Sequence, residues 1–149
     1  MPKVRVKKKS HASHKSAARL LAVQALYQIL LTRQKYEDVL KEFVKFRIEK
    51  SKVDMELFET ILSGVSKKIK NIDKQISKLI KDDWKIDRIE PVVLSILRSG
   101  IFELQQNEDS FRKIIINEYI NIAHSFFNGK EPAFINAILD KVSKSELLR

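Results

Sequence analysis

The amino-acid sequence predicts an all-α protein of about seven helices. Apolar residues recur at spacings of three and four through most of the chain, which is the period of an amphipathic helix. No segment alternates apolar and polar residues for long enough to require a β-strand. One early segment is apolar around most of its circumference, so it must be covered on several sides. These features indicate a helical bundle, and 149 residues are enough to bury its core in one domain.

The segment from Ser16 to Leu31 is predicted to be the central helix of this bundle. Ala, Leu and Gln are frequent in it, no Gly or Pro interrupts it, and Ser16 is expected to cap its first turn. At about 100° per residue, Lys15, Arg19 and Arg33 project within an arc of about 40°. The sequence therefore predicts an exposed basic ridge on the helix that also carries the core.

Two amphipathic helices are expected next, over residues 36–50 and from Asp54, as the capping residue, toward Ile80. We expect a break in the second near Ser66 or Asn71. Lysines line the outer face of its last part, and two interpretations of that face stay open, a solvated surface or a second phosphate-binding patch. These residues are Lys67, Lys70, Lys74, Lys78 and Lys81.

A further helix is expected to reach Leu104. Asp87 and Glu90 have the spacing of a capping box, and Pro91 suits the opening turn. Gly100 within this helix indicates the close approach of a neighbouring element.

The last two helices are expected over residues 112–127 and from Pro132. A polar turn at 107–110 is predicted to cap the first of them, which should end at Asn128-Gly129.

Residues 1–14 are predicted to form a disordered basic arm, because they contain almost nothing apolar to bury. The arm includes Lys7, Lys8 and Lys9. Blocks of like charge beside a folded domain are typical of nucleic-acid contacts, and a merely solubilising terminus is the alternative.

Residues 15–149 are expected to form one domain, with an N-terminal half over 15–81 and a C-terminal half over 86–144. The polar stretch Asp82-Asp83-Trp84-Lys85 is interpreted as the connection between the halves. Its two adjacent aspartates do not provide a cation cage without further ligands. Trp84 either packs over the seam between the halves or stacks on a base.

The composition favours a polyanionic partner and argues against an enzyme. The formal net charge is +10, and residues 1–19 hold seven Lys or Arg and no acidic residue. Cysteine is absent, and the three glycines do not form a phosphate-binding loop or a dinucleotide fingerprint. The three histidines lack an obvious orienting carboxylate. We expect no cofactor, no metal and no membrane span, and a cytoplasmic location.

Four sequence blocks, in order and suitably spaced, resemble the family of the transcription antitermination factor NusB. The first is Ala18-Arg19 leading into Ala22-Val23-Gln24-Ala25-Leu26-Tyr27, and the second is Ile96-Leu97-Arg98 with Phe102-Glu103-Leu104. The third is Ile116-Asn117-Glu118 with Ser125-Phe126, and the fourth is Phe134-Ile135-Asn136 with Leu139-Asp140-Lys141.

The resemblance implies a NusB-like bundle of two packed three-helix subdomains. It also implies binding of a boxA-type single-stranded leader RNA together with the ribosomal small-subunit protein that acts as NusE. In that assembly RNA polymerase resists termination during ribosomal RNA transcription, and no catalysis is involved. The free protein is expected to be a monomer or a homodimer.

This chain departs from the family pattern at three places, one of which is the absence of the proline that often precedes the I-N-E helix. Lys15, Ser16 and Ala17 stand where several arginines are common, and lysine offers a point charge where arginine offers a planar fork. Ala137 replaces the usual glycine of the closing block. No motif for the NusE surface transfers to this chain.

Carried over residue by residue, the RNA surface comprises the basic arm, Lys15, Arg19, Tyr27 and Phe134, and Lys130 adds to the attraction. For Tyr27 a core role and base stacking both stay open, because it projects about 80° from Arg19 into the apolar face. Phe134 lies at the rim of its helix's apolar face, where core packing and base stacking are again both possible.

Two other functions are compatible with these features. One is a helical protein-interaction scaffold without specific RNA binding. The other is the RNA-binding appendage of a ribosomal RNA methyltransferase, of which this chain would be only a fragment.

Overall fold

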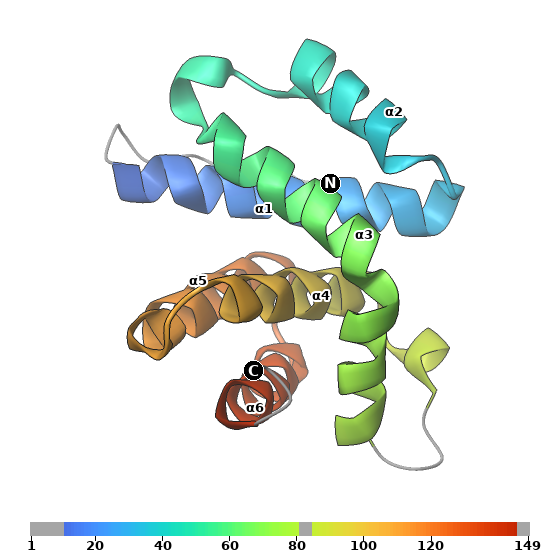
Figure 1. The fold of residues 1–149 in the computed structure, drawn as a ribbon, viewed down its shortest axis with the longest axis vertical. Coiled ribbons are helices and arrows are strands. Elements are labelled where there is room, and N and C mark those ends of the chain that lie inside the picture. Colours follow the sequence, from blue (N-terminus) through green and yellow to red (C-terminus); the bar gives the residue numbers. More distant parts are fainter. Residues whose placement is uncertain (1–10, 81–84, 146–149) are drawn as a thin grey trace.

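The computed structural model describes residues 11–80 and 85–145, and this part of the chain is helical without a strand, as predicted (Figure 1). It contains six α-helices, one fewer than expected. They are α1 (His11–Thr32), α2 (Tyr36–Glu42), α3 (Met55–Leu79), α4 (Pro91–Gln106), α5 (Arg112–Phe126) and α6 (Glu131–Lys144). Short helical turns lie between them: η1 (Phe43–Arg47), η2 (Lys50–Lys52), η3 (Ile86–Arg88) and η4 (Asp109–Phe111).

The missing helix is explained by α3, which bends without ending. Lys68 has non-helical angles, φ −106° and ψ 15°, so in place of the break expected near Ser66 or Asn71 there is a kink at Lys68 inside one helix. Asp54 caps α3 as predicted, since its side chain accepts a hydrogen bond from the backbone N–H of Leu57 at 3.0 Å.

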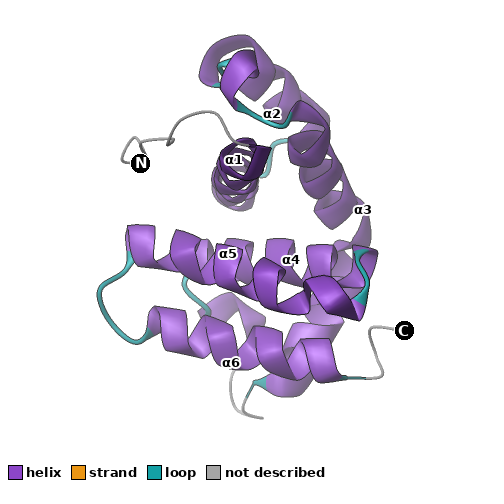
Figure 2. Cartoon of the chain, turned by 90° about the vertical axis from the view of Figure 1, so that its left-hand side faces the viewer, coloured by secondary structure: helices purple, strands orange, loops and turns teal. Residues whose placement is uncertain are grey.

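Helix α1 lies between two groups of helices. Figure 2 shows α2 on one side of it and α4 with α5 on the other, and α3 runs down past both groups. The helix with the most complete burial is nevertheless α4, in which every residue from Val93 to Leu104 is buried. The expectation that α1 is the central helix is therefore only partly right: α1 is covered from Ala17 to Leu26 except at Leu21, and its end at Leu31 is exposed.

Several predicted helix starts are displaced. Helix α1 begins at His11, so Ser16 is an internal residue and not a cap, and the expected arm loses its last four residues to the helix. Glu90 itself caps α4 by accepting hydrogen bonds from the backbone N–H groups of Val92 and Val93. The polar turn at 107–110 does not cap α5, which follows Phe111 without a side-chain cap.

The predicted helix over 36–50 was too long. It ends at Glu42 and continues as the π-helical turn η1, where the wider winding shifts the apolar spacing. Phe43 remains fully buried and stacks on Phe58, whereas Phe46 is 72% exposed. Phe46 thus lies off the buried face that Phe43 occupies.

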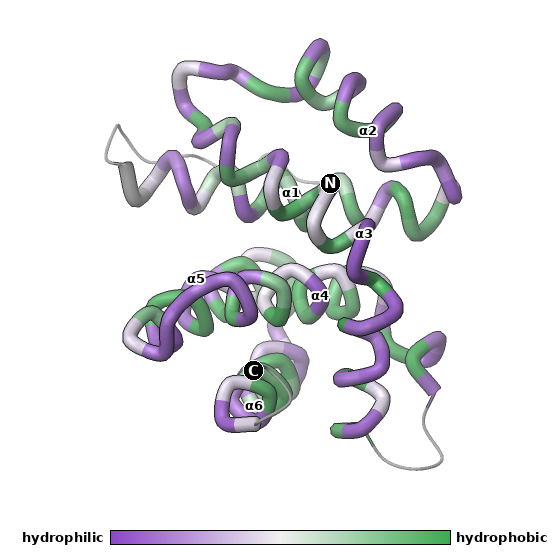
Figure 3. The backbone as a smooth tube through the Cα atoms, in the orientation of Figure 1, coloured by the Kyte–Doolittle hydropathy of each residue, from purple (hydrophilic) through white to green (hydrophobic). Residues whose placement is uncertain are grey.

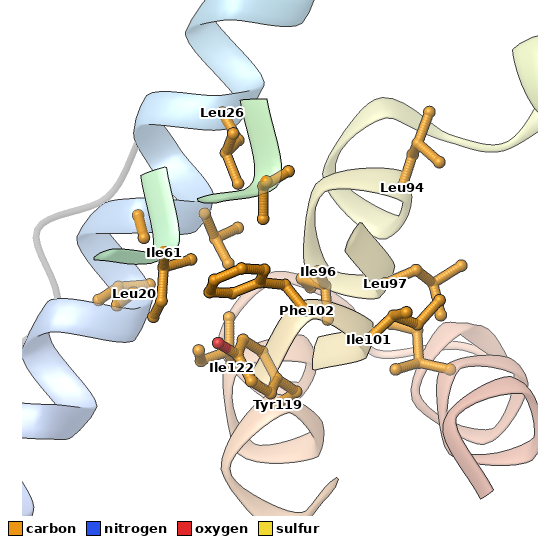
Figure 4. Packing of buried hydrophobic residues seen from close by; sticks show 14 of the residues in the cluster. Leu20, Leu26, Ile61, Leu94, Ile96, Leu97, Ile101, Phe102, Tyr119 and Ile122 are labelled. Carbon is orange, nitrogen blue, oxygen red and sulfur yellow. The ribbon is translucent and has the colours of Figure 1, made fainter. Parts of the chain in front are cut away.

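Close packing across α4 depends on two glycines. A side chain at Gly100 would place its Cβ 2.9 Å from Leu139 Cδ2 of α6, which confirms the predicted close approach. Gly64 of α3 faces the ring of Phe102 so closely that a Cβ there would overlap it. Figure 4 shows this ring on the side of α4 that faces Leu20 of α1 and Ile61 of α3.

The second half of α3 is mostly hydrophilic and is attached to α4 through an ion pair. Figure 3 shows this half largely in purple, whereas α4 is mostly green and white. Arg98 donates two hydrogen bonds to Asp73, Nε to Oδ1 and Nη2 to Oδ2, both at 2.9 Å. Among the predicted lysine face, Lys67, Lys70, Lys74 and Lys78 are exposed, while Lys81 lies outside the described residues.

We predict that Gly64→Ala lowers the free energy of unfolding by about 1–3 kcal/mol, because the new methyl group overlaps Phe102 in a close-packed core. Thermal and urea denaturation would measure the change. Combining it with Phe102→Leu should cost less than the sum of the two single substitutions, and simple additivity would contradict the overlap.

Candidate nucleic-acid interface

The first turns of α1 are fixed to α4 and α5 by buried charged groups. Arg19 donates from Nε to Glu103 Oε1 at 2.6 Å and from Nη2 to Glu103 Oε2 at 3.1 Å. Its Nη1 donates to Glu118 Oε1 at 2.9 Å. One guanidinium on α1 therefore holds a carboxylate from α4 and another from α5.

Two hydroxyl groups complete this arrangement. Tyr119 donates from its phenol to Glu103 Oε1 at 2.7 Å, and Ser16 donates to Glu118 Oε1 at 2.9 Å. We call these five side chains the Arg19 network: Ser16, Arg19, Glu103, Glu118 and Tyr119. Arg19 is 8% exposed, Glu103 4% and Tyr119 not at all, so these three members are screened from water, whereas Ser16 and Glu118 are half-buried.

The network shifts the pKa values of two of its members. Burial alone would lower the pKa of the Arg19 guanidinium, but the hydrogen bond to Glu103 and its charge outweigh burial and raise that pKa. Burial, followed by the charge of Glu103 and the hydrogen bond to it, raises the pKa of the Tyr119 phenol well above its ordinary value. Arg19 therefore stays charged and Tyr119 stays neutral inside the bundle.

The expectation that Arg19 forms part of an exposed basic ridge is wrong. The helical period predicted on which side of α1 Arg19 lies relative to Lys15. It could not show that α4 and α5 pack on that side and place Glu103 and Glu118 against Arg19. Sequence reasoning also missed Glu103 and Glu118 as its partners, and Ser16 as a second donor to Glu118. Glu103 and Glu118 stand inside two of the family blocks, and these blocks were the available signal.

Lys15 has the predicted exposure. It lies one position before Ser16, and no carboxylate among the described residues forms an ion pair with it. Because Ser16 and Arg19 are anchored, the helical turn that carries Lys15 is held in place. Arg33 is also exposed, just after the end of α1, with a left-handed φ of 61°.

The remaining predicted residues lie on other turns or elements than Lys15. Tyr27 is half-buried and about 18 Å further along the α1 axis, and it is not among the hydrophobic side chains packed on the core. Lys130 is exposed just before α6, and Phe134 is half-buried one turn later and packs against the core. The backbone N–H of Phe134 donates to the carbonyl of Lys130 at 3.1 Å, so those two residues share a turn.

Some predicted features lie outside the described residues. These include Lys7, Lys8 and Lys9 of the arm and the stretch with Asp82, Asp83 and Trp84. Within residues 11–80 and 85–145, no group of three acidic or histidine side chains is arranged to hold a metal ion. In the same residues no helix has the length and apolar character to cross a membrane.

Comparison with known proteins identifies the family to which this chain belongs. The model described as NusB family matches residues 16–144. The chain belongs to the NusB family. This confirms the resemblance of the four sequence blocks and the NusB-like helical fold. The NusB family is a family of transcription antitermination factors, and the relatives found carry that name.

Curated relatives and a solved structure share most of their length with this chain. The transcription antitermination protein NusB of Mesorhizobium japonicum is 38% identical over 141 residues, which cover 90% of this chain and 91% of that protein. The NusB protein of Rhizobium rhizogenes is 36% identical over 140 residues, covering 89% and 88%. The structure of T. maritima NusB aligns with a TM-score of 0.76 at 26% identity, covering 87% of this chain and 90% of that one.

We predict that Arg19→Met destabilises the fold by about 3–5 kcal/mol, because it leaves Glu103 buried without its charged partner. Adding Glu103→Gln should recover part of this loss, since the neutral amide costs less to bury. Urea denaturation of the two single variants and the double variant measures the coupling. If Arg19→Met and the double variant lost the same free energy of unfolding, the buried unpaired charge of Glu103 would not be the cause of the loss.

The raised pKa of Tyr119 predicts a loss of stability at alkaline pH. Above about pH 10 the unfolded chain releases the Tyr119 proton while the folded chain retains it, so the free energy of unfolding falls as pH rises. Denaturation between neutral pH and about pH 11 should show a shallower fall for Tyr119→Phe, which has no proton to release. Equal slopes for the two proteins would contradict this assignment.

Proposed function

We propose that this chain acts in transcription antitermination by binding a boxA-type single-stranded leader RNA together with the ribosomal small-subunit protein that serves as NusE. The complex would make RNA polymerase resistant to termination during ribosomal RNA transcription. The family and its curated relatives support the antitermination role. The single observation that supports RNA contact in this chain is the exposed Lys15 on a turn immobilised by the Arg19 network.

A held lysine suits phosphate recognition. A flexible cation must lose conformational freedom when it binds, whereas the backbone around Lys15 is already held. Ser16 and Arg19, which follow it, bind Glu118, and the carbonyl of His14, which precedes it, accepts a hydrogen bond from the backbone N–H of Asp54. The preceding residues of the sequence add the positive charges of Lys7, Lys8 and Lys9. These cations would supply the electrostatic, sequence-independent part of the affinity.

In this proposal Arg19 is a positioning residue and not an RNA ligand. Each of its three nitrogens already donates a hydrogen bond to Glu103 or Glu118, and the residue is only 8% exposed, so little of the guanidinium is left for a phosphate. Binding both carboxylates at once requires the planar, forked guanidinium of arginine, because lysine offers only a point charge.

Base recognition would come from aromatic and nearby basic side chains. The half-buried rings of Tyr27 and Phe134 each have part of their surface available, and Lys130 stands one turn from Phe134. Stacking on unpaired bases is the usual way that proteins recognise single-stranded RNA. No step of this function requires a catalytic group, in keeping with a binding role.

The test is a fluorescence anisotropy titration of a boxA-type leader RNA and of a scrambled RNA, with and without the NusE protein, at two salt concentrations. We expect the boxA-type RNA to bind more tightly, with a further gain when NusE is present. Lys15→Gln should lower the slope of log affinity against log salt by about 0.7, the value for one phosphate contact on a single strand.

Lys35→Gln is the matched control, because Lys35 is an exposed lysine beyond the other end of α1. It should leave the salt slope unchanged. Equal binding of both RNAs under every condition would reduce the interaction to attraction of any polyanion. Undiminished NusE binding without RNA binding would favour the helical protein-interaction scaffold.

A further inference from the structure

An exposed aromatic side chain lies in the connection between α2 and α3. We call residues 45–52 the basic segment; it comprises the end of η1, Ile48, Glu49 and η2. Phe46 is 72% exposed, more than the other large exposed hydrophobic side chains, Leu31, Phe111 and Ile114. The Nζ of Lys45 lies 5.1 Å from the centroid of the Phe46 ring. The ring is thus largely in solvent, with the Lys45 ammonium over one of its faces.

The charges around Phe46 are mostly positive. The basic segment contains Lys45, Arg47, Lys50 and Lys52, and Glu49 is its one carboxylate. Glu49 pairs with Lys52 at 3.3 Å, but both side chains are more than half exposed, so the pair is weak. Lys45, Arg47 and Lys50 form no ion pair with any of the described carboxylates.

The basic segment is held firmly enough to present these groups. The guanidinium of Arg47 lies over the ring of Phe43 at 4.6 Å from its centroid, and Phe43 is buried against Phe58. Ile48 is half-buried and packs against the core. Phe43 and Ile48 thus anchor the two sides of Phe46, and the π-helical winding of η1 turns Phe46 outward.

The basic segment also lies beside the proposed RNA contact. The backbone N–H of Asp54 donates to the carbonyl of His14 at 3.1 Å, and η2 packs against α1. In Figure 1 the chain between α2 and α3 lies above the blue first half of α1 and descends toward it at the start of α3. Lys15 immediately follows His14. One strand could therefore contact both places.

We propose that the basic segment is a second contact site for single-stranded RNA, in which Phe46 stacks on an unpaired base and Lys45, Arg47 and Lys50 bind the adjacent phosphates. This inference rests on the proposed RNA binding of the chain and extends it. A protein partner fits less well, because one ring surrounded by cations offers little of the continuous apolar core that protein interfaces bury.

The test uses the full chain and a fluorescein-labelled boxA-type single-stranded RNA of about 20 nucleotides, long enough to reach both sites. Phe46→Ala should weaken binding by about tenfold, the size expected for one lost stack, and should leave the salt slope unchanged. Phe46→Trp should retain the affinity of the parent chain. Lys45→Gln should instead lower the salt slope by about 0.7.

Phe111→Ala is the matched control, since Phe111 is also an exposed phenylalanine but lies in η4, before α5. It should bind RNA like the parent chain. Because Phe46 is largely in solvent, Phe46→Ala should keep the parent melting temperature, so a loss of affinity is not a loss of folding.

The outcomes separate this inference from the proposed function. If the parent chain binds RNA and Lys15→Gln weakens it while Phe46→Ala does not, the second site is overturned and the proposed function stands. If the parent chain binds no RNA, both are overturned. A Phe46→Ala variant that keeps its RNA affinity but loses NusE would assign the segment to a protein contact and overturn the RNA site.

Discussion

The position of α1 depends on the buried ion pair between Arg19 and Glu103. The pair is screened from water, with a 2.6 Å contact and a second hydrogen bond, and Tyr119 donates to the same carboxylate. Burying these charges is costly, so the arrangement is favourable only when every polar atom finds its partner. That condition specifies one register of α1 against α4 and α5, which apolar packing alone would define less sharply.

This register explains why nearby positively charged residues have different roles. Arg19 points inward to two carboxylates, whereas Lys15, one helical turn earlier, stays in solvent. The buried arginine fixes the helix, and the exposed lysine is available to a partner. The basic segment adds exposed cations and Phe46 beside the same end of α1. The positive surface is therefore assembled from a helix start and a distant connection, and only folding brings them together.

Much of the fold could be predicted from the sequence because apolar periodicity reports helices directly. The helices, the cap at Asp54 and the close approach at Gly100 all depend on neighbours in sequence or on one small side chain. The burial of Arg19 could not be predicted, because the helical period gives the direction of a side chain from its helix axis but not which neighbouring helix packs on that side. Phe46 could not be placed either, because the π-helical turn changes the period within a few residues. The candidate RNA residues were suggested by the family blocks more than by periodicity.

The bend at Lys68 joins the two sides of the molecule in one continuous backbone. Before the bend, Phe58 of α3 stacks on Phe43, which follows α2. Beyond the bend, Asp73 accepts a hydrogen bond from Arg98 of α4. A straight helix would not make both contacts, and a flexible loop would not fix the relative position of the two sides. The bent helix instead connects the two sides through one continuous helical backbone.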